Sequence, residues 1–327
     1  YADERARSSH AGGIRQVVET MLQSPKFLYR SELGSGGSTR GLTSHELATE
    51  LAYLFTGTMP DDELLAAADA DRLTAPAALE AEARRLLRTP GAKRQLRTFV
   101  TAFMGLGRFD EVTKNQQVFP TFTPKLQASM KAETERFIDA VLWEGDGSWR
   151  SLMTADYSFV DDTLAKHYGL AASGRGDAFV KTALDRNQRS GLLTQGAVLA
   201  AHSKAEESFP ILRGKLVRVG LLCQSLPPPP KVVPKAPEPA ATATSRERFA
   251  QHSSDPACSG CHKLIDPLGF GLEGYDAIGR YRETENGKPI DASGVITNTV
   301  DIDGPYRGAV ELAGKLAGSA EAQECFT

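Results

Sequence analysis

The sequence predicts a mainly α protein in which a helical N-terminal domain packs on a smaller, loop-rich domain with a few short β-strands. Apolar residues recur at helical spacing from residue 14 to residue 223. A proline-rich stretch follows, which must be extended. The remainder is rich in glycine and turn residues. Because 327 residues are enough for two domains, we expect a helical domain at 1–226, a proline-rich strap at 227–243 and a second domain at 244–327.

The first helices have recognisable ends. An amphipathic helix is expected over residues 13–29, where Pro25 disturbs the apolar pattern. Thr43 or Ser44 caps the next helix, which stops near Gly57. Later helices are expected to begin after Pro60 and at Pro76, because proline is favourable at the start of a helix.

The same spacing continues towards the strap, and the apolar sides of these helices are expected to face a core. Further predicted elements are helices over 91–106, 124–143, 191–201 and 210–223, and a β-like run over 179–184.

The second domain is predicted to begin with a short helix. Thr244 or Ser245 caps it, and it leads towards residue 258. Gly287 indicates a hairpin, residues 290–304 suggest short strands, and 310–316 form a closing helix.

Composition excludes several partners. The net charge of -3, with no long single-sign run, offers nothing to attract nucleic acid or anionic lipid. No stretch is apolar enough to span a membrane. The first residues lack the apolar core of a signal peptide, so the chain is expected to be a processed or excised form.

Cys258, Cys261 and His262 form a CxxCH motif, the attachment site of c-type haem. Two thiols add to the vinyl groups, and the adjacent imidazole binds iron from one face. We therefore expect one covalent haem c, which makes residues 244–327 a c-type haem domain. The alternatives are a zinc site that adds His252, or a redox dithiol.

The second axial ligand of the iron is less defined. His252, shortly before the motif, and His202, after a small-residue helix, are the candidates for the distal position. The haem could also be five-coordinate. All methionines precede the strap, which disfavours a self-contained His/Met cytochrome: Met21, Met59, Met104, Met130 and Met153.

Residues after the motif can form the wall of a haem pocket. Ile265, Leu268, Phe270 and Tyr275 are candidate lining residues, and Arg280 is a candidate partner of the haem propionates. Several glycines between them would permit close approach of the backbone to a flat cofactor: Gly269, Gly271, Gly274 and Gly279.

The two remaining cysteines, Cys223 and Cys325, can pair. Haem c is attached outside the bacterial inner membrane, where a disulfide also survives, so we expect an exported protein, periplasmic, cell-surface or extracellular. The alternative is two free buried thiols.

Several long segments in order resemble one family. They include LATELAYLFTGTMPDDELL, FPILRGKLVRVGLLCQSLPPPP, DPACSGCHKLIDPLGFGLEGYDAIGRYR and IDASG. The chain is similar to bacterial exported cytochrome-like proteins built from domains of unknown function (DUF1592, DUF1588 and DUF1585), often preceded by a separate cytochrome c-like domain. The resemblance implies a secreted c-type haem protein, and it supports the Cys223–Cys325 disulfide and a role for His252. Members commonly have Met where this chain has Ile265.

Electron transfer with a redox partner protein, or with a further cytochrome domain or subunit, is the leading hypothesis. A haem oxidoreductase of peroxidase type, assisted by His202 or Arg213, and a haem-stapled structural or binding module are the alternatives. No hydrolase motif is present. Asp301 and Asp303 before Gly304 resemble part of a calcium loop, but a turn is the favoured interpretation.

Overall fold

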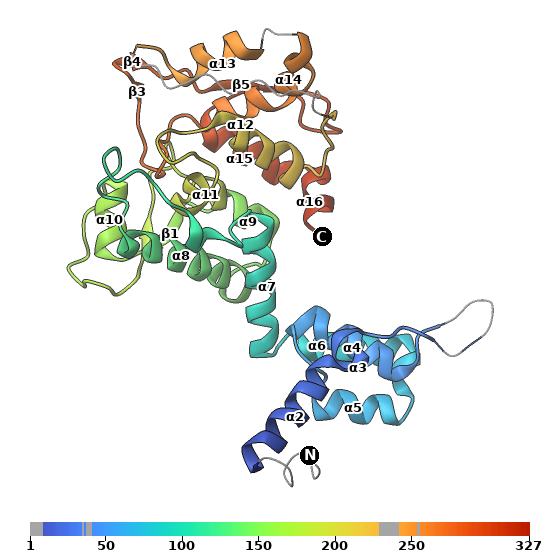
Figure 1. Cartoon of the computed structure of the whole chain (residues 1–327). Helices are drawn as coiled ribbons and strands as arrows, with labels where there is room; N and C mark the ends of the chain where they lie inside the picture. Colours follow the sequence, from blue (N-terminus) through green and yellow to red (C-terminus); the bar gives the residue numbers. More distant parts are fainter. Residues whose placement is uncertain (1–8, 35, 37–40, 229–241, 254–255) are drawn as a thin grey trace. The chain divides into compact units, whose positions relative to one another are not determined.

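The computed structural model describes residues 9–34, 36, 41–228, 242–253 and 256–327, without the side chains of 251–253, 256 and 257. As predicted, it is mainly α, and the described residues form three two-stranded sheets (Figure 1). Contacts divide the chain into a smaller unit, Tyr1–Leu96, and a larger unit, Arg97–Thr327. Most of the strap at 227–243 lies outside the described residues. No described helix is long and apolar enough to cross a membrane.

The smaller unit begins with two helices separated at Pro25. The predicted break is confirmed, because α2 ends one residue before Ser24 and α3 begins at the proline. The apolar side of α2 does not reach a core here, since Ile14 is 47% exposed and Met21 is 62% exposed. These elements are α2 (His10–Gln23) and α3 (Pro25–Leu28).

The remaining helices of the smaller unit enclose a small core. Thr43 caps α4 in a reciprocal pair with Glu46, and Gly57 ends this helix with a φ of 69°. Asp61 caps α5. The elements are α4 (Ser44–Thr56), α5 (Asp62–Asp69), the 3₁₀ turn η1 (Arg72–Thr74) and α6 (Pro76–Leu86). The buried residues are Ala48, Ala52, Leu64, Ala67, Ala68, Leu73 and Leu86.

The larger unit is a helical assembly with short hairpins. Its helices are α7 (Pro90–Phe103), which crosses the boundary between the units, η2 (Phe109–Glu111), α8 (Pro124–Asp139), the π-helix η3 (Ala140–Glu144), α9 (Trp149–Thr154), α10 (Asp162–Tyr168), η4 (Leu192–Thr194), α11 (Gly196–Ala201), α12 (Pro210–Lys215), the π-helix η5 (Leu216–Leu221), α13 (Ser245–Ser253), α14 (Pro256–Phe270), α15 (Gly308–Gly318) and α16 (Ala320–Phe326).

The strands pair in antiparallel hairpins. In the first sheet β1 (Tyr157–Val160) pairs with β2 (Val180–Ala183). The predicted hairpin at Gly287 joins β3 (Thr284–Glu285) to β4 (Lys288–Pro289), and the φ angles of Asn286 (52°) and Gly287 (75°) are those of a type I′ turn. In the third sheet β5 (Ser293–Ile296) pairs with β6 (Gly304–Arg307), with Ser293 opposite Arg307.

The predicted helix over 191–201 is interrupted. Gly191 has a φ of 51°, and a Cβ there would lie 2.3 Å from the Leu152 carbonyl oxygen. Only glycine accepts both constraints. The chain therefore turns at Gly191, forms the short η4 and starts α11 at Gly196.

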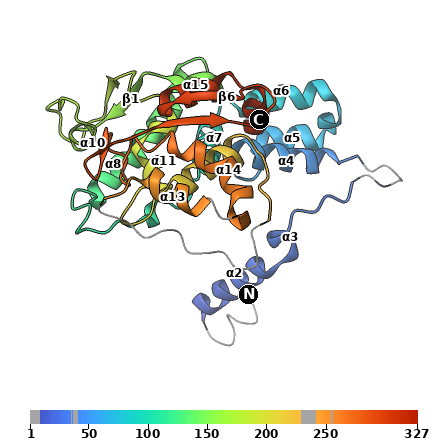
Figure 2. The ribbon, with the colours of Figure 1, turned by 90° about the horizontal axis from the view of Figure 1, so that it is seen from above.

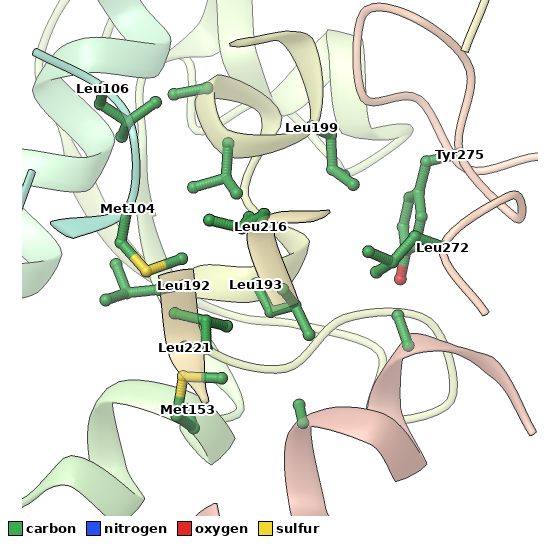
Figure 3. Close-up of a cluster of buried hydrophobic side chains, with 14 of the residues drawn as sticks. Met104, Leu106, Met153, Leu192, Leu193, Leu199, Leu216, Leu221, Leu272 and Tyr275 are labelled. Atoms are coloured by element: carbon green, nitrogen blue, oxygen red, sulfur yellow. The ribbon is translucent and has the colours of Figure 1, made fainter. Parts of the chain in front are cut away.

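One hydrophobic core runs through the larger unit and includes residues on both sides of the strap. Leu268 and Leu272 in and after α14 belong to the same buried cluster as Met130 and Val217. Figure 3 shows Met104, Leu193, Leu216 and Leu272 among the side chains of this cluster. The division at Leu96 therefore differs from the predicted domains 1–226 and 244–327. The prolines predicted an extended strap, but they do not indicate which side chains share a core.

Candidate functional site

Cys258, Cys261 and His262 lie on α14. Their spacing of i, i+3 and i+4 places them on one face of the helix. Cys258 is buried, Cys261 is half-buried, and both thiols are free of disulfides. The Cys261 sulfur lies 3.5 Å from the carbonyl oxygen of Pro227, at the start of the strap. The helix thus presents two thiols and an imidazole together, as attachment of haem c requires.

A buried carboxylate holds the His262 ring. Nδ1 of His262 lies 2.8 Å and 3.0 Å from the two carboxylate oxygens of Asp266, one turn further along α14. Because a carboxylate oxygen accepts, Nδ1 of His262 donates to Asp266, and Nε2 is the ring nitrogen that can serve as a metal ligand. Sequence reasoning missed Asp266, although its position four residues after His262 on a helix was a usable signal.

A cavity of about 500 Å³ lies beside His262. This is within the range of ordinary small-molecule sites, roughly 300–1,000 Å³. Its wall combines two cations with mainly apolar side chains. The lining residues are Arg246, Ala250, His262, Lys263, Asp266, Pro267, Phe270, Ser293, Gly294, Val295, Pro305 and Tyr306.

Arg246 of α13 closes one side of the cavity. Its guanidinium carbon lies 4.4 Å from the centre of the Phe270 ring. Its Nε donates to the Asp291 carbonyl oxygen at 2.9 Å, and Nη2 donates to the carbonyl oxygen of Ser293. The sequence prediction missed this cation because Arg246 precedes the motif on a separate helix, which lies beside α14 (Figure 2).

Close packing fixes α14 from both sides. A Cβ at Gly214 of α12 would lie 1.9 Å from the Ile265 carbonyl oxygen, and one at Gly269 would lie 1.9 Å from the Pro210 carbonyl oxygen. From β5, a Cβ at Gly294 would lie 2.4 Å from the Pro267 carbonyl oxygen. These contacts leave no room for side chains.

Backbone carbonyls of α14 also receive side-chain donors. Nε of Arg218 in η5 donates to the Leu264 carbonyl oxygen at 3.2 Å. The Tyr306 hydroxyl donates to the Pro267 carbonyl oxygen at 2.6 Å. Because Pro267 lies inside the helix and has no N–H of its own, these outside donors help to hold α14 where its own hydrogen-bond ladder is interrupted.

The residues predicted to line the haem pocket separate into two groups. Phe270 lines the cavity beside His262. Leu268 and Tyr275 lie in the core of the larger unit, Tyr275 donating its hydroxyl proton to the Gln188 carbonyl oxygen. Ile265 is buried at 4% exposure. The Nε of Arg280 pairs with Asp276 at 2.8 Å. None of these four is among the residues that line this cavity.

The glycines expected to approach a cofactor contact protein instead. Gly269 meets Pro210, Gly271 meets the Tyr306 ring, and a Cβ at Gly279 would lie 2.7 Å from the Cα of Gly196. The glycine pattern indicates that other atoms lie close to the backbone at these positions, but it does not identify whether they belong to a cofactor or to the protein.

The structure describes the side chain of one of the two candidates for the distal iron ligand and not that of the other. His202 is half-buried at the end of α11, where Nδ1 lies 2.8 Å from the Val198 carbonyl oxygen, and partial burial lowers its pKa. It packs against Gly105 and does not line the cavity beside His262. His252 lies in α13, and its side chain is outside the described part of the structure.

Other charged candidates have structural partners. Arg213 is buried and donates through Nη1 to the Leu272 carbonyl oxygen and through Nη2 to that of Asp276, both at 2.7 Å. Asp301 accepts from Ser319, and Asp303 accepts from Thr299, in keeping with the turn expected there. In the part of the chain that is described, no group of three or more His, Cys, Asp or Glu residues is placed to hold a metal ion.

The predicted disulfide is present. Cys223 and Cys325 are bonded, with an S–S distance of 2.09 Å and a Cα–Cα distance of 5.5 Å. The bond spans 102 residues and joins the end of η5 to α16. It therefore closes a loop that contains the whole of α14.

Comparison with family models gives two matches. Residues 42–170 match the model PSD4, described as a protein of unknown function (DUF1592), and residues 189–285 match PSCyt3, a protein of unknown function (DUF1588). The second region contains the motif on α14. Searches of curated proteins and of solved structures give no match. The expected DUF1585 region stays a prediction. The chain therefore contains one region that is similar to the DUF1592 family and a second region that is similar to the DUF1588 family.

Proposed function

We propose that this protein binds one haem c covalently and transfers electrons. The observation that carries the proposal is the arrangement on α14, where both thiols and His262 share one face of the helix and His262 also lines a mainly apolar cavity. The cavity volume of about 500 Å³ and the contact of the His262 Nδ1 with Asp266 support it. The name of the PSCyt3 model also points to cytochromes.

The residues present fit this group. Cys258 and Cys261 would form the two thioether bonds, and Nε2 of His262 would be the axial ligand. Arg246 and Lys263 would pair with the two propionates, while Phe270 and Val295 would form apolar wall. Bound haem would supply a one-electron Fe(III)/Fe(II) couple.

The proposal includes a compartment and a partner. The Cys223–Cys325 disulfide is of the kind that persists in oxidising compartments, which supports export to the periplasm, the cell surface or the medium. The sequence holds a single CxxCH motif. One haem relays electrons over distance only with another redox centre nearby, so we propose a redox partner protein or a further cytochrome domain or subunit.

Covalent attachment is tested by expression in a bacterium that exports the chain and matures c-type cytochromes. The expected product carries the mass of one haem through denaturation and gives a c-type pyridine haemochrome. The double variant Cys258→Ser/Cys261→Ser should lose both signals, while Cys223→Ser/Cys325→Ser keeps the attached haem. The cells also produce a second cytochrome as a control. Haem attachment would be refuted if the wild-type chain carried no haem while the control cytochrome matured normally.

Electron transfer is tested with the absorption spectrum in both oxidation states. We expect a low-spin, six-coordinate spectrum and rapid reversible reduction. A stable high-spin iron that readily binds cyanide or peroxide would instead support the peroxidase alternative. Loss of folding without loss of a redox phenotype in Cys258→Ala/Cys261→Ala would support the structural alternative.

A further inference from the structure

The carboxylate of Asp266 approaches His262 with both oxygens. The distances to Nδ1 are 2.8 Å and 3.0 Å, and the side chains of His262 and Asp266 are 12% and 5% exposed. Water therefore competes little for this contact. A hydrogen bond to an ionised acceptor is roughly twice as strong as one between neutral groups, and low surrounding polarity strengthens it further.

The backbone around Asp266 is held firmly. Pro267 follows directly, and its carbonyl oxygen accepts the Tyr306 hydroxyl at 2.6 Å. The backbone of Gly294 crosses at the same point, where it leaves no space for a side chain. The carboxylate thus sits on a fixed turn of α14, so its position relative to the imidazole is set before any ligand binds.

A carboxylate at Nδ1 has two effects on an imidazole ligand. It fixes the tautomer, so that Nε2 carries the lone pair, and it raises the basicity of the ring. A more basic and more negative ligand stabilises the more positive oxidation state of a bound iron. Second-shell hydrogen bonds of this kind are among the levers that set haem potentials.

We infer that Asp266 is a positioning residue for His262, which holds the Nδ1–H tautomer and lowers the reduction potential of the haem iron. This inference rests on the proposed function, because it concerns the iron bound at Nε2. It adds a specific role for a residue that is not itself a ligand.

The charge effect is tested by comparing Asp266→Asn with Asp291→Asn. Asn keeps an acceptor for the Nδ1 proton but removes the charge. Asp291 is the control, because its carboxylate pairs with Arg246 at 3.3 Å, so that the same change of charge is made away from the His262–Asp266 pair. We expect Asp266→Asn to raise the equilibrium constant for reduction about tenfold, which is a positive shift of ~59 mV for one electron, while Asp291→Asn shifts it much less. Equal shifts in both variants, or none in Asp266→Asn, would overturn the inference.

The tautomer is tested without haem. In the haem-free chain, nitrogen-15 NMR of wild type should report His262 protonated at Nδ1. Asp266→Asn should retain this tautomer, and Asp266→Ala should lose it. A wild-type ring protonated at Nε2 would overturn the inference even before haem is added.

The two proposals fail in different ways. A chain that never acquires haem but shows the expected tautomer refutes the proposed function and leaves the His262–Asp266 pair intact. A chain with attached haem and unchanged potential in Asp266→Asn refutes the role of Asp266 and leaves the haem protein intact.

Discussion

Charged side chains lie deep inside the larger unit. Arg213 and Glu273, each nearly inaccessible, form an ion pair at 3.3 Å. The Ser208 hydroxyl donates to Glu273 at 2.6 Å, and Arg282 lies 3.4 Å from the same carboxylate. Removing one partner of such a pair leaves an uncompensated buried charge. The group therefore fixes the segment after α14 against α12.

Glu133 of α8 is a second buried acid. It accepts hydrogen bonds from the hydroxyls of Ser158 and Tyr168, both at 2.6 Å. Burial raises its pKa from 4.5 to about 7. The folded protein therefore binds this proton more tightly than the unfolded chain does, and the resulting stability is lost as the pH rises through about 7.

Glu133→Gln should remove this pH dependence. Relative to wild type, we expect the variant to gain stability as the pH rises from 5 to 8, because the unfolded wild type releases the Glu133 proton at lower pH than the folded protein does; the difference approaches about 3 kcal/mol at 1.36 kcal/mol per pKa unit. Urea unfolding of both proteins across this range measures it. Parallel stability curves for wild type and variant would contradict the pKa shift.

Single residues were predictable where chemistry demands a fixed spacing. The Cys223–Cys325 pair followed from parity and compartment and is confirmed, whereas the haem roles of Cys258, Cys261 and His262 follow from a motif and stay predictions. Arg246 was not predictable, since its place beside Phe270 depends on how α13 crosses α14. Leu268 and Tyr275 were assigned to a cofactor wall because apolar residues near a motif do not reveal which core they enter.

The crossing of α12 and α14 positions the candidate site. Gly214 and Gly269 let the two helices touch backbone to backbone (Figure 1). Such contact transmits a displacement of one helix directly to the other, because no flexible side chain lies between them.

Gly214→Ala should therefore separate the helices. The added Cβ would lie 1.9 Å from the Ile265 carbonyl oxygen, so we expect a loss of stability of at least about 3 kcal/mol. Gly314→Ala is the matched control, because this glycine of α15 has open space around its Cβ position and alanine should stabilise its helix by roughly 0.5–1 kcal/mol. Thermal unfolding of both variants tests the pair, and equal effects would contradict the close crossing.

Most helices were predictable because caps and prolines mark their starts. Thr43, Asp61 and Pro76 each do so as expected. The exceptions have tertiary causes. The predicted helices over 124–143 and 210–223 end in the π-helices η3 and η5, and no local pattern distinguishes a π-turn from an α-turn. The break at Gly191 reflects the approach of Leu152 from another helix.

The folding units follow the core and not the strap. Because α14 and α15 share one buried cluster with α8 and α11, a fragment of residues 244–327 should not fold alone. A fragment of residues 90–327, which keeps α7 whole, should fold cooperatively. Circular dichroism with thermal unfolding of the two fragments checks this. A cooperative transition in the shorter fragment would favour the predicted boundary at residue 244.

The disulfide should contribute to the stability of the larger unit. In the chain-entropy model a loop of about 100 residues is worth roughly 4.7 kcal/mol, and the Cys223–Cys325 bond spans 102 residues. We expect Cys223→Ser/Cys325→Ser to lower the free energy of unfolding by about 2–5 kcal/mol. Denaturant unfolding of the haem-free chain measures the loss, because bound haem cannot then stabilise the fold and mask the effect of removing the disulfide. An unchanged midpoint would show that packing alone holds α16.

Cys258 and Cys261 lie between Cys223 and Cys325 in the sequence, so the order in which the four thiols react matters during biosynthesis. Every complete pairing of the four thiols uses Cys258 and Cys261, so only the single bond Cys223–Cys325 leaves both of them available for haem. In the proposed export of the chain Cys223 would emerge first and Cys325 last, so an oxidase acting on thiols in order of appearance would trap Cys223 with an inner cysteine. The proposed haem attachment therefore requires a cell that keeps Cys258 and Cys261 reduced until Cys325 has arrived or haem has been attached.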